Sequence, residues 1–275
     1  MQRPYRSVDH VVLRLLAAEP LYGLLSDTLG LPVAWPLQHE AFATYGWVHL
    51  GNTDLELWAA SSNSDLPSHT PAPLIHGFAL EPMATLRESL SWMDEAQLAV
   101  RAPRAFRSQT TAGEWVTNFT NAVVLDVSSP SCCVFFCEWD RCATIYPWDA
   151  AETPVVRRAQ LREALAQRRG GALGITGMQS IQLGTPHLEL TRRHWRTLTG
   201  SVGGDVIALT SDIALELIPA QHLAIESICL GVRSLAQARS VLRDLHLLQE
   251  DVGSSLYLAA QGLQIQLKEA LPGSS

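Results

Sequence analysis

The chain repeats one pattern along its length. A short apolar segment typical of a strand is followed by a segment with the spacing of an amphipathic helix. The strand-like segments are VDHVVLRL (8–15), LIHGFALE (74–81), MQSIQLGT (178–185) and IESICLGV (225–232), and the helix-like segments cover 20–30, 84–98, 187–200 and 234–248. In the last helix-like segment the apolar residues Leu235, Ala238, Leu242 and Leu245 recur every three or four positions, as on one helical face. Such repetition predicts a fold assembled from copies of one supersecondary unit.

Short alternating runs follow each helix-like segment and indicate further strands. The first unit contains TYGWVHLG (44–51) and TDLELWAA (53–60), whereas the third is shorter, with DVIALTS and DIALELIP. Each unit therefore consists of a strand, a helix and two or three strands. We predict an α+β fold of four βαβββ modules, of which the third is degenerate, paired into two cup-shaped sheets with flanking helices.

The segment between the second and third units differs from the repeats. It contains TPVVRRAQLREALAQRRGG, which is typical of an added helix that ends at a glycine pair. We therefore predict an N-terminal module pair over residues 1–140, a linker with a helix over 141–172, and a C-terminal module pair over 173–275. We expect the arginine pairs of the linker helix, Arg157–Arg158 and Arg168–Arg169, to lie on a solvated face.

Composition excludes several classes of protein. The 275 residues are 47% hydrophobic and 17% charged, which is enough apolar content for a buried core and too much for a disordered chain. The net charge of −7, without a long basic run, argues against a nucleic-acid or anionic-membrane partner. We see no run near the roughly 20 apolar residues of a membrane helix, no secretory signal and no phosphate-binding glycine loop. We expect a cytoplasmic protein without a nucleotide cofactor, either a monomer or a homodimer.

The module arrangement resembles the vicinal oxygen chelate superfamily, which includes glyoxalase I and the extradiol dioxygenases. The segments VDHVV, LELWA and VFFCEWD are similar, more narrowly, to a glyoxalase-like domain family. The resemblance covers nearly the whole chain as an arrangement of modules and is specific at these three segments. It implies that paired modules curl their strands into an open cup, with a divalent metal bound by the first and last strand of each module.

The resemblance also implies which positions hold the metal. The first-strand positions are His10, His76, Ser180 and Ser227, and the last-strand positions are Glu56, Glu138, Glu216 and Gln266. Two imidazoles and two carboxylates in the N-terminal pair suit Zn, Ni, Mn or Fe(II), whereas the C-terminal pair has too few strong donors. We predict a metal site of His10, Glu56, His76 and Glu138, in which Glu56 and Glu138 are the catalytic candidates. Glu56 is either a fourth ligand or a general base, and the alternative is a polar cup that kept part of an ancestral site.

Strand alternation predicts the neighbours of these ligands. Arg14 shares the face of His10, at the rim of the cup, and is a candidate to bind a substrate carboxylate. Trp139 follows Glu138 directly, so we expect it on the opposite face. Aromatic side chains often line small-molecule pockets. The further candidates for substrate binding are Val12, Phe78, Phe136, Trp47 and Trp58.

Two functions are compatible with this pattern. The first is a metal-dependent enzyme that acts on a small oxygenated organic molecule as an isomerase, lyase or dioxygenase. The second is a non-catalytic protein of the same fold that sequesters a small molecule in its aromatic cup. The metal content of the purified protein distinguishes the two. A third, structural hypothesis is that the C-terminal pair, which lacks the ligands, serves only to dimerise the chain or to shield the cup.

Overall fold

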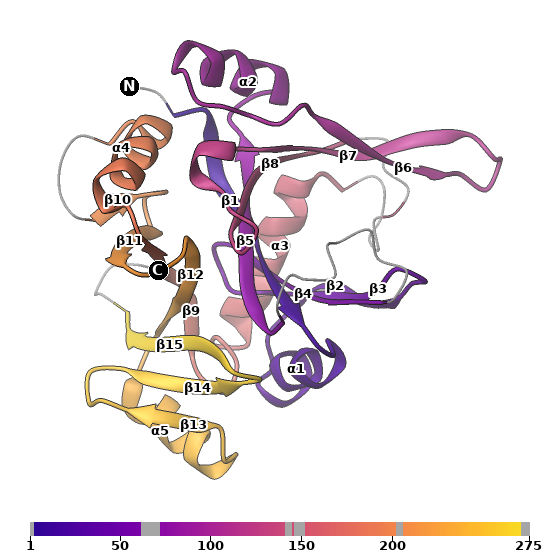
Figure 1. Cartoon of the computed structure of the whole chain (residues 1–275). Coiled ribbons are helices and arrows are strands. Elements are labelled where there is room, and N and C mark those ends of the chain that lie inside the picture. The colour runs from indigo at the N-terminus through magenta and orange to yellow at the C-terminus, as the bar shows by residue number, and fades with distance from the viewer. Residues whose placement is uncertain (1–2, 62–71, 141–144, 146–151, 202–205, 271–275) are drawn as a thin grey trace.

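The computed structural model describes residues 3–61, 72–140, 145, 152–201 and 206–270. The first two units of the chain form its N-terminal half (Figure 1). The first unit consists of β1 (Tyr5–Leu15), α1 (Glu19–Gly23), a π-helical turn (Leu24–Thr28), β2 (Val33–His39), β3 (Ala43–His49) and β4 (Asp54–Ala60). The second consists of β5 (Leu74–Pro82), α2 (Leu86–Glu95), β6 (Arg104–Gln109), β7 (Trp115–Val123), a 3-10 turn (Leu125–Val127) and β8 (Cys133–Trp139).

A linker helix and two further units complete the chain. The linker helix is α3 (Pro154–Gln167). The third unit consists of β9 (Ile175–Thr185), α4 (Leu188–Thr199), β10 (Val206–Ala208) and β11 (Ala214–Pro219). The fourth consists of β12 (Ala224–Val232), α5 (Leu235–Asp244), β13 (Leu248–Asp251), β14 (Leu256–Ala260) and β15 (Leu263–Glu269). The element order thus follows the predicted modules, and the described part of the third unit has only two strands after its helix.

Strand pairing is the same in all four units. The first strand of each unit runs parallel to its last strand, as in β1 with β4, β5 with β8, β9 with β11 and β12 with β15. The first strands of neighbouring units run antiparallel, β1 with β5 and β9 with β12. The fold is therefore a mixed sheet with helices outside it, in agreement with the predicted α+β class.

The two halves are not separate sheets. Ile225 of β12 pairs with Ile75 of β5, so the described strands form one sheet of fifteen. Trp195 of α4 is fully buried and stacks on Phe78 of β5, with ring centroids 5.8 Å apart. The prediction of two distinct sheets is wrong in this respect, because the first strands of the two halves meet and share both backbone hydrogen bonds and core.

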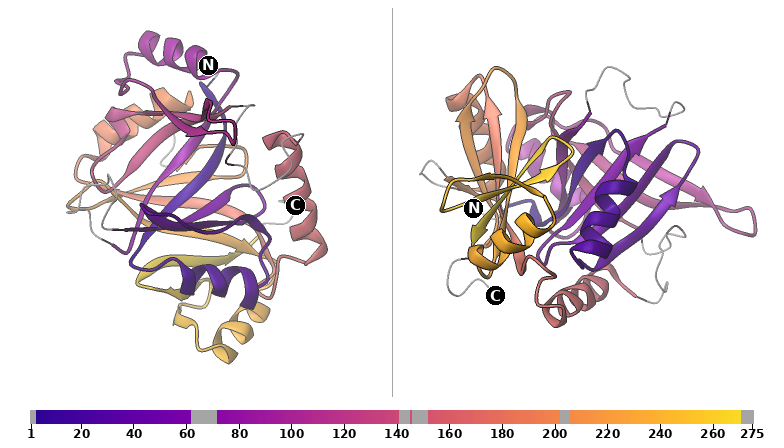
Figure 2. Two further views of the ribbon diagram at one scale, coloured as in Figure 1. Left: turned by 90° about the vertical axis from the view of Figure 1, so that its right-hand side faces the viewer. Right: turned by 90° about the horizontal axis from the view of Figure 1, so that it is seen from below.

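Helix α3 lies beside the N-terminal half, as the views of Figure 2 show. The hydroxyl of Thr153 caps its start by accepting a hydrogen bond from the amide of Val156, and Pro154 occupies its first turn. Gly170 and Gly171 follow its end in left-handed conformations that favour glycine. A helix and a glycine pair thus lie within the segment predicted as a linker, whereas the predicted boundary at residue 141 lies outside the described residues. No helix in the described ranges is long and apolar enough to cross a membrane.

Candidate functional site

One face of the N-terminal strands gathers most of the predicted site residues. In β1 it bears His10, Val12 and Arg14, which pair in register with Asp54, Glu56 and Trp58 of β4. The three β4 residues in turn pair with His49, Trp47 and Tyr45 of β3. Paired residues on neighbouring strands share a face, so the side chains form three rows across β3, β4 and β1. We call this surface the inner face; the other face packs into the main core with the helices.

His10 and Glu56 meet on the inner face. The Nε2 of His10 lies 3.5 Å from the Oε2 of Glu56; the side chain of His10 is buried and that of Glu56 is 13% exposed. On its other side, the Nδ1 of His10 forms a hydrogen bond of 2.7 Å with the Oδ2 of Asp9. The ring of Trp47 lies 4.4 Å from the His10 ring. The imidazole is therefore held between two carboxylates and against an aromatic wall.

Burial and neighbouring charges act in opposite directions on the pKa of His10 and on that of Glu56. Burial lowers the pKa of His10, but the hydrogen bond to Asp9 and the charges of Asp9, Glu56 and Asp54 outweigh it, so the pKa is raised. Burial raises the pKa of Glu56, and the charge of His10 only partly offsets this. Both groups thus hold a proton more readily than in water. Together they can pass a proton to or from a bound molecule.

Asp9 anchors His10 to two other elements. Its Oδ2 accepts a hydrogen bond of 3.3 Å from the indole Nε1 of Trp139 in β8. Its Oδ1 lies 2.6 Å from the Nη2 of Arg158 in α3. Burial raises the pKa of Asp9, but the charge of Arg158 and the bond to His10 outweigh it and hold the pKa well below its usual range. Asp9 therefore stays ionised.

Helix α3 covers the end of the inner face where His10 lies. Figure 1 shows α3 between two groups of strands, β2–β4 and β6–β8. The Nη1 of Arg158 also lies 3.3 Å from the Oε2 of Glu81 in β5, and Leu161 packs with Trp35 and Trp47. A cavity of only about 30 Å³ remains between α3 and the strands. The expectation that Arg158 lies on a solvated face is wrong, because its side chain is 18% exposed and bound to two carboxylates.

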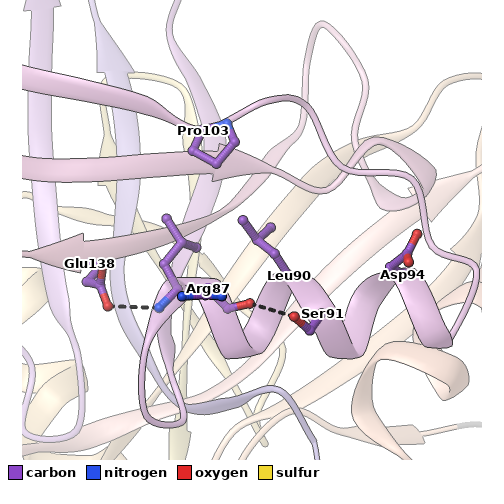
Figure 3. Close-up of a pocket in the computed structure, with 7 residues that line it drawn as sticks. Arg87, Leu90, Ser91, Asp94, Pro103 and Glu138 are labelled. Atoms are coloured by element: carbon purple, nitrogen blue, oxygen red, sulfur yellow. Dashed lines mark hydrogen bonds between the residues drawn. The ribbon is translucent and has the colours of Figure 1, made fainter.

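Glu138 lies away from the inner face. Its Oε1 accepts a hydrogen bond of 2.8 Å from the amide of Leu86, at the start of α2. It lines a groove of about 550 Å³ beside that helix, as Figure 3 shows. Phe135 and Trp139, at the alternate positions of β8, contact His10 and Asp9 instead. The sequence predicts Glu138 on the inner face and Trp139 on the outer face. The two residues do lie on opposite faces of β8, as alternation requires, but Trp139 is the one on the inner face.

His76 lies beside Arg14 rather than in contact with a carboxylate. The Nδ1 of His76 is buried without a hydrogen-bond partner in the described part of the chain. Burial, and then the charge of Arg14, lowers the pKa of His76 to about 4. The imidazole is therefore neutral at pH 7. Its position in β5 falls where the pairing with β1 shifts, between Val12 opposite Gly77 and Leu13 opposite Ile75.

The predicted metal donors are thus only partly brought together. His10 and Glu56 meet, but the described residues contain no group of three His, Cys, Asp or Glu side chains arranged to hold a metal ion. One imidazole and one carboxylate are too few protein donors for the expected site of four. The donor set therefore does not fit a divalent metal held by the protein alone, and we derive no chemistry through one.

The other candidates divide between the inner face and the core. Val12, Arg14, Trp47 and Trp58 lie on the inner face, whereas Phe78 and Phe136 are fully buried in the main core. In the C-terminal half, polar residues bind one another: Ser227 with Gln182, and Gln266 with Tyr257. Ser180 is buried in β9, opposite Ala214, and Glu216 lies opposite Gln182.

Sequence reasoning missed Asp9, Phe135 and Arg158. A signal for Asp9 is present, because an acidic residue interrupts an apolar strand there as Glu56 does in β4. Nothing local marks Arg158, since its partners Asp9 and Glu81 are 149 and 77 positions away in the sequence.

Comparison with known proteins identifies the fold. No protein-family model matches the chain, and no curated protein sequence does. Among solved structures, a hypothetical protein from Staphylococcus aureus is similar with a TM-score of 0.62 and 10% identity, over 96% of this chain and 99% of that one. Homoprotocatechuate 2,3-dioxygenase from Arthrobacter globiformis matches with a TM-score of 0.58 and 10% identity, over 100% of this chain and 84% of that one.

A third similar structure is a complex with a small molecule. It is homoprotocatechuate 2,3-dioxygenase from Brevibacterium fuscum with 3,4-dihydroxyphenylacetate, at a TM-score of 0.58 and 11% identity, over 100% of this chain and 85% of that one. At these identities the similarity concerns the fold and not the activity. The chain therefore has the fold of homoprotocatechuate 2,3-dioxygenase.

Proposed function

We propose that the inner face of the N-terminal half binds a small organic molecule. The observation that carries this proposal is the buried contact between His10 and Glu56, framed by Trp47 and Phe135. A few polar groups set in an aromatic wall are typical of ligand sites. The substrate complex of a dioxygenase with the same fold supports a small-molecule ligand.

The ligand approaches from the end of the inner face that α3 leaves uncovered. That end carries Trp58, which stacks on Tyr45 with ring centroids 5.5 Å apart, and Phe42, which is 43% exposed. A molecule bound there lies against Trp58 and reaches Glu56 with its polar part. The raised pKa values of Glu56 and His10 allow the pair to donate a proton to it or to accept one.

A screen by thermal shift tests the proposal. Small aromatic and oxygenated molecules are expected to raise the Tm of the full chain, since a ligand that binds only the folded state stabilises it. The effect is expected to vanish in Trp58→Ala and to persist in Trp115→Ala, which removes a tryptophan that is 66% exposed. Equal loss in both variants, or no stabilising compound among several hundred, contradicts the proposal.

A metal-dependent enzyme, the function that the sequence predicts, is the second candidate, although the described donors alone do not complete a metal site. The observation that favours it is again the 3.5 Å contact, because His10 and Glu56 are two of the donors that the sequence predicts. Metal analysis of protein purified without added metal tests it. About one divalent ion per chain, lost in both His10→Ala and Glu56→Ala, supports this candidate. Metal far below one per chain, or metal retained in both variants, contradicts it.

A further inference from the structure

We infer that the ligand of the inner face carries a carboxylate and that Arg14 binds it. This inference rests on the function proposed above and adds the chemical class of the ligand. Arg14 lies in β1, four residues beyond His10, at the end that α3 leaves uncovered. It is 7% exposed, and its Nη1 is removed from water.

Within the described residues, Arg14 lacks the partner that a buried charge normally has. No ion pair among the described residues includes Arg14, and its Nη1 is buried without a hydrogen-bond partner there. Burial lowers the pKa of its guanidinium, in keeping with a charge that nothing nearby stabilises. An unpaired buried arginine costs stability, and a ligand anion removes that cost.

Two further unpartnered nitrogen atoms lie around Arg14. Trp58 is its register neighbour in β4, and the indole Nε1 of Trp58 is buried without a partner in the described chain. His76 is close enough that the charge of Arg14 lowers its pKa, and its Nδ1 is also unpartnered there. Arginine and tryptophan side chains only donate hydrogen bonds. The missing group must therefore be an acceptor, and a carboxylate satisfies the planar guanidinium best.

The charges around the site favour a monoanion over a phosphate dianion. Arg14 is the single cation of this cluster, because the pKa of His76 is about 4 and its ring is neutral at pH 7. Glu56 lies one row away, opposite Val12, and adds no positive charge that could balance a second negative charge on the ligand. The aromatic rings of Trp58, Tyr45 and Phe42 stack beside the row and suit an apolar remainder of the ligand. The ligand class is thus a small organic monocarboxylate.

Matched probes test the carboxylate directly. Benzoate, its neutral analogue benzamide, and inorganic phosphate are titrated into the full chain by calorimetry. We expect benzoate to bind at least tenfold more tightly than benzamide or phosphate. In Arg14→Met the preference for benzoate over benzamide is expected to disappear, whereas Arg107→Met, at an exposed arginine of β6, is expected to keep it.

The stability of the ligand-free protein provides a second readout. Arg14→Met is expected to raise the Tm, because it replaces an unpaired buried charge by an apolar side chain of similar length. An arginine with a merely structural role gives the opposite sign. The inference is overturned if Arg14→Met lowers the Tm, if benzoate and benzamide bind alike in the unaltered protein, or if phosphate binds more tightly. Benzamide binding that Trp58→Ala abolishes leaves the proposed function intact in those cases. If none of the three probes binds, the carboxylate inference is overturned, and the thermal-shift screen alone decides the proposed function.

Discussion

The Nη2 of Arg158 in α3 lies 2.6 Å from the Oδ1 of Asp9 in β1. Because the other oxygen of Asp9 binds the Nδ1 of His10, one carboxylate joins the linker helix to the histidine of the inner face. The helix is therefore part of the site. Its arginine keeps Asp9 ionised, and Asp9 in turn orients the imidazole and raises its pKa.

Replacing Arg158 is expected to destabilise the protein strongly. Arg158→Ala leaves Asp9 buried without its cation and removes the contact to Glu81, which corresponds to a loss of about 3 kcal/mol in the free energy of unfolding. Urea denaturation measures this loss. Arg162→Ala, at an exposed position of the same helix, is the control and is expected to change stability by less than about 0.5 kcal/mol. Equal effects of the two substitutions would show that the Arg158 pair contributes nothing.

Glu138 is expected to stabilise α2 and not to take part in ligand binding. Glu138→Ala removes the acceptor for the amide of Leu86, so about 1 kcal/mol of stability is lost, as for other residues that cap a helix start. Ligands found in the screen are expected to bind this variant as well as they bind the unaltered chain. Glu56→Ala serves as the comparison and is expected to weaken binding. Lost binding in Glu138→Ala, with α2 intact by circular dichroism, would contradict the placement of this side chain.

His76 is expected to make stability depend on pH in the acidic range. Its pKa is about 4 in the folded chain, below the value near 6.5 of a free histidine, so the unfolded chain binds more protons between these values. The contribution of His76 to the free energy of unfolding is complete above pH 6.5 and is lost as the pH falls towards 4. The loss in the free energy of unfolding amounts to at most about 3 to 4 kcal/mol, at 1.36 kcal/mol per pKa unit.

Urea denaturation at a series of pH values measures this dependence. His76→Gln is expected to flatten the fall in stability between pH 6.5 and 4. His39→Gln, which alters a histidine with a 63% exposed side chain, is expected to leave the curve unchanged. Because His10 has a raised pKa, its own contribution is lost at the opposite end, as the pH rises. A curve that His76→Gln does not alter would mean that the ring titrates normally.

The module plan was predictable from the sequence because each repeat carries its own local signal. Apolar strand segments such as 8–15 and 225–232 recur before amphipathic helices, and the glycine pair marks the end of α3. The contact of His10 with Glu56 was predictable from the family resemblance, which implies that the first and last strands of a module direct these two positions to one site. The equivalent position in the second unit, Glu138, does not follow this rule.

The remainder of the site depends on relations that no local pattern contains. Alternation places Glu138 and Trp139 on opposite faces of β8, but which face points inward depends on how β8 pairs with β5. Strand β5 is in turn paired with β1 in a register that shifts near His76. The contact of α3 with the inner face depends on residues more than 70 positions apart. The unpartnered state of Arg14 depends on what surrounds it in space, which the sequence predicted only as a position on the rim.

Gly77 is expected to be irreplaceable for both fold and site. Its φ is +154°, and a Cβ atom added there would lie 1.9 Å from the carbonyl oxygen of Cys133 in β8, a backbone atom that cannot move alone. Gly77→Ala must therefore push β8 away from β5 and cost several kcal/mol of stability. Because β8 carries Phe135 and Trp139, the same displacement withdraws both rings from His10 and Asp9.

Gly113→Ala is the matched control for this substitution. Gly113 also has a positive φ, of +83°, but an added Cβ would meet nothing within 4 Å. Its replacement is expected to cost only about 1 kcal/mol through backbone strain. Urea denaturation measures both losses, and ligand binding is expected to persist in Gly113→Ala alone. If Gly77→Ala costs no more than Gly113→Ala, strands β5 and β8 are not packed at the distance that brings Phe135 to His10.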